Sequence, residues 1–180
     1  MHSERTASLG LTAGLRLRPL RLDDETAFRA ACEMLAAEDF NFGLGLEPGM
    51  AWPDYLARLD KQRFDVDQPG MVPGTFLVAD VAGEIVGRAS IRHELNDFLA
   101  RQGGHIGYAV LPGHRRRGYA TEILRQSLVI ARAAGVGRVL VICDEGNTGS
   151  RAVIEACGGK LGGIATIAAQ PTPIRRYWID

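Results

Sequence analysis

The stretch from residue 105 to residue 157 constrains the fold more than any other, because strand-like and helix-like patterns alternate along it. An apolar run over residues 105–111 precedes a helical pattern over 118–134. A second apolar run, 138–143, precedes a second helical pattern that starts at Asn147. Two strands joined by a crossover helix lie parallel to each other. The sequence therefore predicts a mixed α/β (α+β) domain that contains a parallel pair of strands.

A basic turn lies between the first of these strands and its helix. It consists of Arg115, Arg116 and Arg117, followed by Gly118. The first amides of a helix have no partner within the helix, so this end attracts anions. Arginine adds positive charge, and glycine lets a ligand approach the backbone closely. The turn therefore predicts a site for a phosphate-bearing ligand.

The remaining segments predict strands and helices on either side of this unit. A first strand stops near Pro19, and a helix capped by Asp23 or Asp24 continues to about residue 37. A second helix covers about 53–64, and strands over 75–80 and 84–92 form a hairpin. After residue 157, the glycines at 158, 159, 162 and 163 predict turn and bulge around Lys160, followed by strands over 164–168 and 174–179.

Composition limits the number of domains and the classes of partner. With 180 residues and 46% hydrophobic content, the chain fits a single domain over 15–180, preceded by a flexible leader over 1–14. The 21 basic residues balance the 21 acidic ones, which disfavours nucleic acid or a membrane as a partner. Three cysteines without metal-ligand spacing predict no metal site and favour a cytoplasmic location, and no secretory signal or membrane span is evident.

Two motifs resemble those of the GNAT superfamily of N-acetyltransferases. Residues 115–120 resemble the acyl-CoA pyrophosphate signature R/Q-x-x-G-x-G/A, and residues 107–112 resemble the strand that enters it. Asn147, Ser150 and Val153 resemble the second motif, N-x-x-S-x-x-V/I. Residues 103–108 and 176–179 further resemble a bacterial subgroup of predicted acetyltransferases. The resemblance covers essentially residues 15–180.

The resemblance implies a fold and a donor. The fold would be a central mixed, mostly antiparallel sheet of about seven strands with a splayed parallel pair, flanked by about four helices. The donor would be acetyl-CoA, with its pantetheine arm in the splay and its pyrophosphate on the amides of residues 116–121. The implied cofactor-binding residues are Tyr108, Ala109, Val110, Arg115, Arg116, Arg117, Gly118, Tyr119, Ala120, Thr121, Asn147 and Ser150. Asn147 could instead serve only as a helix N-cap.

Catalysis in this family is direct attack of an amine on the thioester, which requires a base and an acid. His105 stands where many relatives place a carboxylate, so it is the predicted base, although a structural histidine is the alternative. His93 and Glu94 are a second choice. Many relatives carry a tyrosine seven residues after the asparagine, but this chain has Ile154, so Ser150 is predicted to stabilise the thiolate instead.

The acceptor is predicted only as a small-molecule or peptide amine, bound between residues 40–52, residues 92–104 and the last two strands. Phe40 and Phe42 in the first of these segments favour packing on the core over lining a pocket, and Tyr177 is open to both roles. Cys157 is predicted to be a packing residue. The alternatives are a non-catalytic acyl-CoA-binding or regulatory module, another acyl donor, and an oxygen acceptor. The protein would be a monomer or a homodimer.

Overall fold

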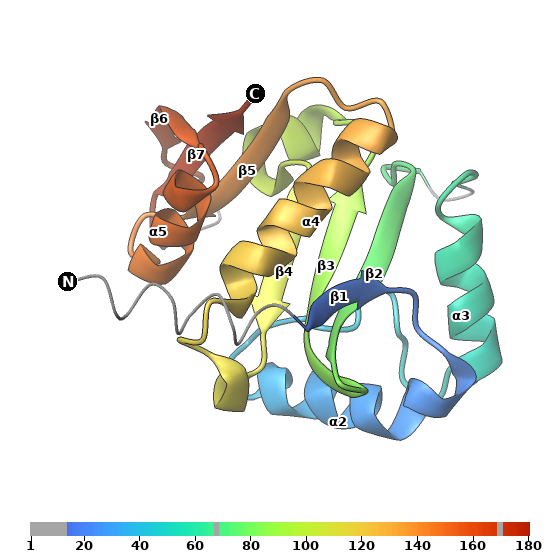
Figure 1. The fold of residues 1–180 in the computed structure, drawn as a ribbon. Helices are drawn as coiled ribbons and strands as arrows, with labels where there is room; N and C mark the ends of the chain where they lie inside the picture. Colours follow the sequence, from blue (N-terminus) through green and yellow to red (C-terminus); the bar gives the residue numbers. More distant parts are fainter. Residues whose placement is uncertain (1–13, 67–68, 169–170) are drawn as a thin grey trace.

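Seven strands within the described residues form two sheets that meet along β4 and β5 (Figure 1). The structure is a computed structural model that describes residues 14–66, 69–168 and 171–180, so the predicted leader lies almost entirely outside the described residues. The first sheet has the antiparallel order β1 (Leu15–Arg18), β2 (Gly74–Val81), β3 (Glu84–Arg92), β4 (Ile106–Val110). The second has the antiparallel order β5 (Val139–Asp144), β7 (Ile174–Ile179), β6 (Lys160–Ala165).

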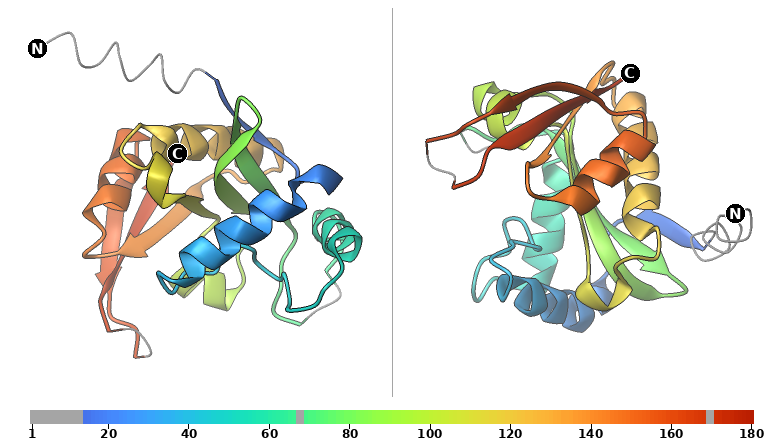
Figure 2. Two further views of the ribbon diagram at one scale, coloured as in Figure 1. Left: turned by 90° about the horizontal axis from the view of Figure 1, so that it is seen from below. Right: turned by 90° about the vertical axis from the view of Figure 1, so that its left-hand side faces the viewer.

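Helices cover both faces of the first sheet (Figure 2). The four α-helices in the described part of the chain are α2 (Glu25–Ala36), α3 (Trp52–Lys61), α4 (Tyr119–Ala133) and α5 (Thr148–Ala156). Short 3-10 turns cover Leu22–Asp24 and Pro112–His114, and a π-helical turn covers Leu99–Gly103. The helices α4 and α5 lie on one face, whereas α2 and α3 lie on the other. The architecture is the predicted mixed α/β fold.

The parallel pair predicted from the sequence is β4 and β5, with α4 returning between them (Figure 1). The two strands share no ladder and are joined only where they begin. There His105 N–H donates to Leu140 O at 2.7 Å, and Leu140 N–H donates to His105 Nδ1 at 2.9 Å. Gly104 has φ +68°, and a Cβ on it would lie 2.7 Å from Leu140 O. Glycine is therefore required where the backbones meet, and the pair opens toward Val110.

Two apolar cores hold the layers together. The first lies between the sheets and α4 with α5, where Ile123, Leu124 and Ile154 are fully buried. The second lies under α2 and α3 and is aromatic: Phe28 packs against Phe42 with ring centroids 5.4 Å apart, and it also contacts Trp52, Tyr55 and Phe76. Phe42 thus packs on the core, as the loop pattern predicts.

A buried ion cluster ties β1 to β2 and to the start of α2. Arg18 Nε donates to Asp80 Oδ2 at 2.8 Å, and its two Nη atoms donate to Asp24 at 2.7 and 2.9 Å. Arg21 N–H also donates to Asp24 Oδ2, at 2.7 Å. Asp24 occupies the N-cap position of α2, but its side chain does not cap that helix. The prediction of an aspartate cap is therefore wrong for Asp24, because Arg18 and the amide of Arg21 hold its carboxylate.

The C-terminal strand pattern differs from the prediction. The sequence places a strand over 164–168, but β6 begins at Lys160 and ends at Ala165. The glycines still act where expected: Gly158 turns the chain with φ +89°, and the register shifts between Leu161 and Gly163. A Cβ on Gly162 would lie 2.7 Å from the Trp178 ring, so this strand needs glycine at the bulge. By contrast, the hairpin of β2 and β3 turns at Ala82 and Gly83 as predicted, and both residues have positive φ. The strand β3 has the predicted ends, and β2 covers Gly74–Val81 where 75–80 was predicted.

Candidate active site

A cavity of about 660 Å³ opens between the end of β4, the start of α4 and the start of α5. Its walls are residues from four separate segments: Leu35, Glu38, Phe40, Tyr108, Ala109, Val110, His114, Arg115, Arg116, Gly118, Tyr119, Ala120, Thr121, Asn147, Gly149, Ser150, Ala152 and Val153. All of the predicted cofactor-binding residues except Arg117 are among them. The splay and the basic turn thus share one cavity, which we call the donor cavity.

The N-terminus of α4 presents unpaired backbone amides beside the basic turn. The first hydrogen bond at this end runs from Glu122 N–H to Gly118 O at 3.2 Å, so the amides of Tyr119, Ala120 and Thr121 precede the helical ladder. Gly118 is the N-cap with φ +81°, and Arg116 has φ +64°. These left-handed residues curl the turn so that its backbone faces the cavity, where an anion would meet both free amides and arginine.

Arg115 is held in place by contacts that sequence reasoning did not identify. Its Nε donates to Val110 O at 3.1 Å, and its Nη atoms donate to both carboxylate oxygens of Glu38 at 3.2 and 2.6 Å. Glu38 follows α2 and lies 77 residues away in the sequence. The pair is half exposed, so it closes one rim of the donor cavity without burying a charge.

The open edge of β4 presents backbone groups to the donor cavity. Leu111 N–H donates to Val86 O, and Arg92 N–H donates to His105 O, which places the odd-numbered residues of β4 in the ladder with β3. In an antiparallel ladder, hydrogen-bonding groups alternate between the two edges of a strand. The N–H and C=O groups of Tyr108 and Val110 therefore point into the splay, whereas those of Ala109 point to β3. Because Val110 O already accepts a hydrogen bond from Arg115, Tyr108 is the residue whose backbone N–H and C=O are both available to a ligand in the splay.

Two hydroxyl groups meet inside the donor cavity. Tyr108 Oη and Ser150 Oγ lie 2.7 Å apart, in the range of a strong hydrogen bond. Burial raises the pKa of Tyr108 above its usual range, and the bond with Ser150 opposes that rise. The phenol is therefore protonated at neutral pH and can serve as a proton donor. Sequence analysis identified Ser150 and the backbone of Tyr108, but it missed the phenol, which lies 42 residues from its partner.

Asn147 fills the N-cap of α5 and also lines the donor cavity. Its Oδ1 accepts a hydrogen bond from Ser150 N–H at 2.9 Å. This bond fixes the side chain and leaves its NH2 group as a donor. The helix-cap role foreseen for Asn147 is thus present, and the geometry is compatible with a second role at the cavity.

His105 lies outside the donor cavity and is only 7% exposed. Because Nδ1 accepts from Leu140 N–H, the neutral ring carries its proton on Nε2 and has no free lone pair. Burial and the nearby Arg92 charge lower the pKa of His105. These contacts support a structural role, and its role as a base stays a prediction. His93 bonds to Thr75 Oγ1 at 2.9 Å instead of pairing with Glu94, and it also lies outside the donor cavity.

The other residues weighed as catalytic candidates are packed or protonated. Ile154, which replaces the tyrosine of many relatives, is fully buried. Tyr177 is 1% exposed and donates its hydroxyl to Glu155 at 2.9 Å, so it belongs to the core. Burial raises the pKa of the Cys157 thiol, which disfavours the nucleophilic thiolate.

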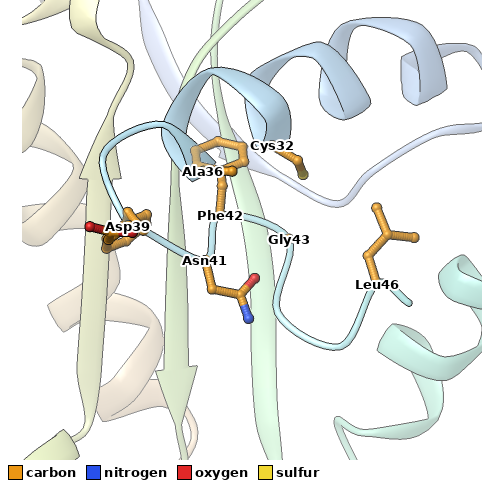
Figure 3. Close-up of a pocket in the computed structure, with 8 residues that line it drawn as sticks. Cys32, Ala36, Asp39, Asn41, Phe42, Gly43 and Leu46 are labelled. Carbon is orange, nitrogen blue, oxygen red and sulfur yellow. The ribbon is translucent and has the colours of Figure 1, made fainter. Parts of the chain in front are cut away.

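A smaller cavity of about 370 Å³ lies under the end of α2, where residues 39–46 cross the sheet (Figure 3). Cys32 and Phe42 line it, and the side chain of Asn41 points away from the helix. Burial raises the pKa of Cys32 to about 11, so its thiol is protonated at neutral pH. A protonated thiol is a poor nucleophile, so we assign no chemistry to this cavity.

The described residues contain no cluster of three or more histidine, cysteine, aspartate or glutamate side chains that could hold a metal ion. Among the same residues, no helix is long and apolar enough to cross a membrane.

The splayed sheet and the basic turn at a helix N-terminus are the arrangement expected of an acetyltransferase fold. The chain belongs to the GNAT acetyltransferase family: the model of the acetyltransferase (GNAT) domain matches residues 14–160. A search of curated proteins finds no match.

Solved structures share the fold at low sequence identity. YncA of Salmonella typhimurium, solved with its cofactor acetyl-CoA, matches with a TM-score of 0.62 and 15% identity over 92% of this chain and 93% of that one. RimJ of Mycobacterium smegmatis, in complex with CoA-disulfide, matches with a TM-score of 0.64 and 23% identity over 92% of this chain and 81% of that one. The spermidine/spermine N-acetyltransferase SpeG of Vibrio cholerae matches with a TM-score of 0.63 and 16% identity over 93% of this chain and 94% of that one.

Proposed function

We propose that this protein transfers an acetyl group from acetyl-CoA to an amine by direct attack of the amine on the thioester. The family and the donor cavity support the donor, since similar folds have been solved with acetyl-CoA and CoA-disulfide. The single observation that carries the catalytic part is the hydrogen bond of 2.7 Å between Tyr108 and Ser150. It places a protonated phenol and a hydroxyl together in a cavity whose other end is built for phosphate.

The donor cavity fits a CoA thioester in size and charge. A volume of about 660 Å³ is typical of small-molecule sites, and its one end combines helix amides with Arg116. When bound, acetyl-CoA supplies the activated acyl group. We assign the pyrophosphate to the amides of Tyr119, Ala120 and Thr121, and the pantetheine arm to the free backbone pair of Tyr108.

The departing thiolate needs a proton, and two hydroxyls are placed to provide it. We assign the proton donor to Tyr108, with Ser150 bridging between the phenol and the sulfur. This arrangement replaces the helix tyrosine of many relatives, whose position is taken by the buried Ile154. Asn147 positions Ser150 through the bond to its amide and offers its NH2 group to the arm.

The experiment compares Tyr108→Phe and Ser150→Ala with the wild type by thiol release from acetyl-CoA over a panel of amines. Loss of a general acid lowers kcat by roughly 10²- to 10⁴-fold, and we expect both variants to fall in this range with CoA affinity changed by less than about threefold. Tyr177→Phe and Ser127→Ala are matched controls, because both hydroxyls are buried and bonded away from the donor cavity.

Two outcomes would contradict the proposal. If Tyr108→Phe and Ser150→Ala turned over like their controls, the hydroxyl pair would have no catalytic role. If the wild type bound CoA but released no thiol with any amine, the acyl-CoA-binding module would be the better description.

The variant Gly118→Glu, which places a carboxylate at the helix N-cap, should abolish CoA binding, and unchanged affinity would refute the placement of the donor.

A further inference from the structure

Two arginines on β3, Arg88 and Arg92, form no ion pair with a described carboxylate, and we call them the arginine pair. Arg88 is buried and only 4% exposed, whereas Arg92 is partly exposed. Its Nη atoms donate to Gly107 O at 3.3 Å and to Asn41 O at 3.1 Å, and its Nε has no hydrogen-bond partner. Among the described residues, no carboxylate lies within ion-pair distance of it.

Arg92 extends this positive charge along the same face of β3. Its Nη1 makes only long contacts, with Gly103 O at 3.3 Å and Gly104 O at 3.4 Å. No ion pair with a described carboxylate is formed by Arg92 either. Burial lowers the pKa of Arg88 to about 10, with a further contribution from Arg92, and burial also lowers the pKa of Arg92. An arginine side chain is charged at neutral pH. Two neighbouring like charges, one of them buried, are costly unless an anion joins them.

Both guanidinium groups reach the same point beside β4. A Cβ on Gly107 would lie 3.6 Å from Arg92 Nη1 and 3.7 Å from Arg88 Nη1. Gly107 pairs with Ser90, and Ser90 and Arg92 line a cavity of about 340 Å³ between β3, α3 and the π-helical turn. The next residue along β4 is Tyr108, whose phenol faces the donor cavity. The arginine pair therefore lies one residue from the proposed site of acyl transfer.

The neighbouring aromatic rings keep the charge in place without neutralising it. The Arg88 guanidinium lies 5.0 Å from the centroid of Phe40 and 5.8 Å from that of Phe76. Such contacts stabilise a cation through its face, and the Nε–H together with the second hydrogen on each Nη atom can still donate to an oxyanion. Phe40 also lines the donor cavity, so this segment connects the two sites.

We propose that Arg88 and Arg92 bind an acidic group, a carboxylate or a phosphate, on the amine acceptor. This inference rests on the proposed function, because it assumes that an amine acceptor binds. It places the acidic group of that acceptor on the side of β4 opposite the Tyr108 phenol. Two arginines against one carboxylate leave a net positive charge near the acceptor. A positive charge lowers the pKa of a nearby ammonium, which favours the neutral amine needed for attack. A polycation such as a polyamine is disfavoured at the same place.

The test measures thiol release from acetyl-CoA with matched acceptors. β-Alanine is compared with β-alaninamide for the carboxylate, phosphoethanolamine with ethanolamine for the phosphate, and spermidine serves as the cationic acceptor. We expect the acidic member of at least one pair to have a kcat/KM at least about tenfold higher, as loss of a charged hydrogen-bonded contact predicts. The pair that shows the preference identifies the acidic group.

Three variants connect this preference to the arginines. Arg92→Gln and Arg88→Gln should reduce it to less than about twofold while CoA affinity is retained. Gly107→Ala places a methyl group where both guanidinium groups converge, at ordinary contact distances, so it should fold and still weaken the preference. Arg138→Gln is the control, because that arginine is exposed and pairs with Asp180. If Arg88→Gln does not fold, the other two variants carry the test.

A binding measurement separates this inference from the proposed function. Calorimetric titration of the CoA-bound protein with succinate, succinamide and inorganic phosphate requires no turnover. Binding of succinate or phosphate, lost in Arg92→Gln and absent for succinamide, would support the anion site even if no amine were acetylated. Failure of both anions to bind, or equal kcat/KM for acidic and neutral acceptors, would overturn the inference. Neither result would affect acetyl transfer as such.

Discussion

Removing the carboxylate of Asp80 should destabilise the protein far more than removing a carboxylate with the same ion-pair distance at the surface. Asp80 is 1% exposed and accepts from Arg18 Nε at 2.8 Å and from Gly83 N–H at 3.0 Å. In Asp80→Ala, Arg18 keeps both contacts to Asp24, so the loss stays below the roughly 3–5 kcal/mol of a fully broken buried pair. Each hydrogen bond to a charged group contributes about 1.5–3 kcal/mol. Because Arg18 keeps its contacts with Asp24, we expect a total loss of about 3 kcal/mol.

The matched control is Glu25→Ala. Glu25 also lies 2.8 Å from its partner, Arg29, but the two side chains are 43% and 35% exposed. An exposed pair at this helical spacing contributes about 0.3–0.5 kcal/mol. Urea unfolding at neutral pH would measure both variants, with the midpoint shifted and the slope unchanged. A loss in Asp80→Ala no larger than that in Glu25→Ala would refute the reasoning that burial makes this cluster strong.

Two further predictions concern the same scaffold. Burial would raise the pKa of Asp24 and of Asp80, but hydrogen bonds from Arg18 and from backbone amides outweigh it and hold both pKa values below their ordinary value. The stability that these low pKa values contribute is present above the unfolded-state pKa, near 4, and is lost as pH falls through the folded-state pKa values. The urea midpoint should therefore fall more steeply from pH 7 to pH 3 for the wild type than for Asp80→Ala. Parallel curves for the two proteins would exclude this linkage. Gly104→Ala should cost about 1–3 kcal/mol in thermal or urea unfolding, because φ +68° and Leu140 O at 2.7 Å both oppose a side chain. Gly137→Ala, in open space, should be near neutral, and equal effects would contradict the role given to Gly104.

Local patterns were sufficient to predict the strand, turn and helix on which the donor site is proposed. The strand, basic turn and helix around Gly118 follow from residues that are adjacent in sequence, and the structure places them as expected with Gly118 at the N-cap. The hairpin at Ala82-Gly83 was predicted for the same reason. Asn147 and Ser150 come from one short motif, and both belong to the first turn of α5, which fixes their spacing.

Contacts between distant segments were not predictable in this way. The phenol of Tyr108 meets Ser150 only because β4 and α5 flank one cavity, and Glu38 meets Arg115 across 77 residues. The prediction placed strand β6 too far along the chain because glycines are poor strand formers. The ring of Trp178, on the neighbouring strand, leaves no room for a side chain at Gly162, and this contact was not visible in the sequence. One signal was present in the sequence: Arg88, Ser90 and Arg92 alternate with the apolar Ala89 and Ile91, which places two arginines on one face of the strand.

The strand order of the second sheet has a consequence for the synthesis of the chain on the ribosome. β7 lies between β5 and β6, and both of its neighbours precede it in sequence. Neither can pair within this sheet until β7 has left the exit tunnel, whereas the first sheet needs nothing beyond β4. In the nascent protein, the basic turn before α4 can therefore form before β5 and α5, which flank the donor cavity, are fixed in place by pairing with β7. Competence to bind the donor should arise abruptly and late, after most of the polypeptide is already folded.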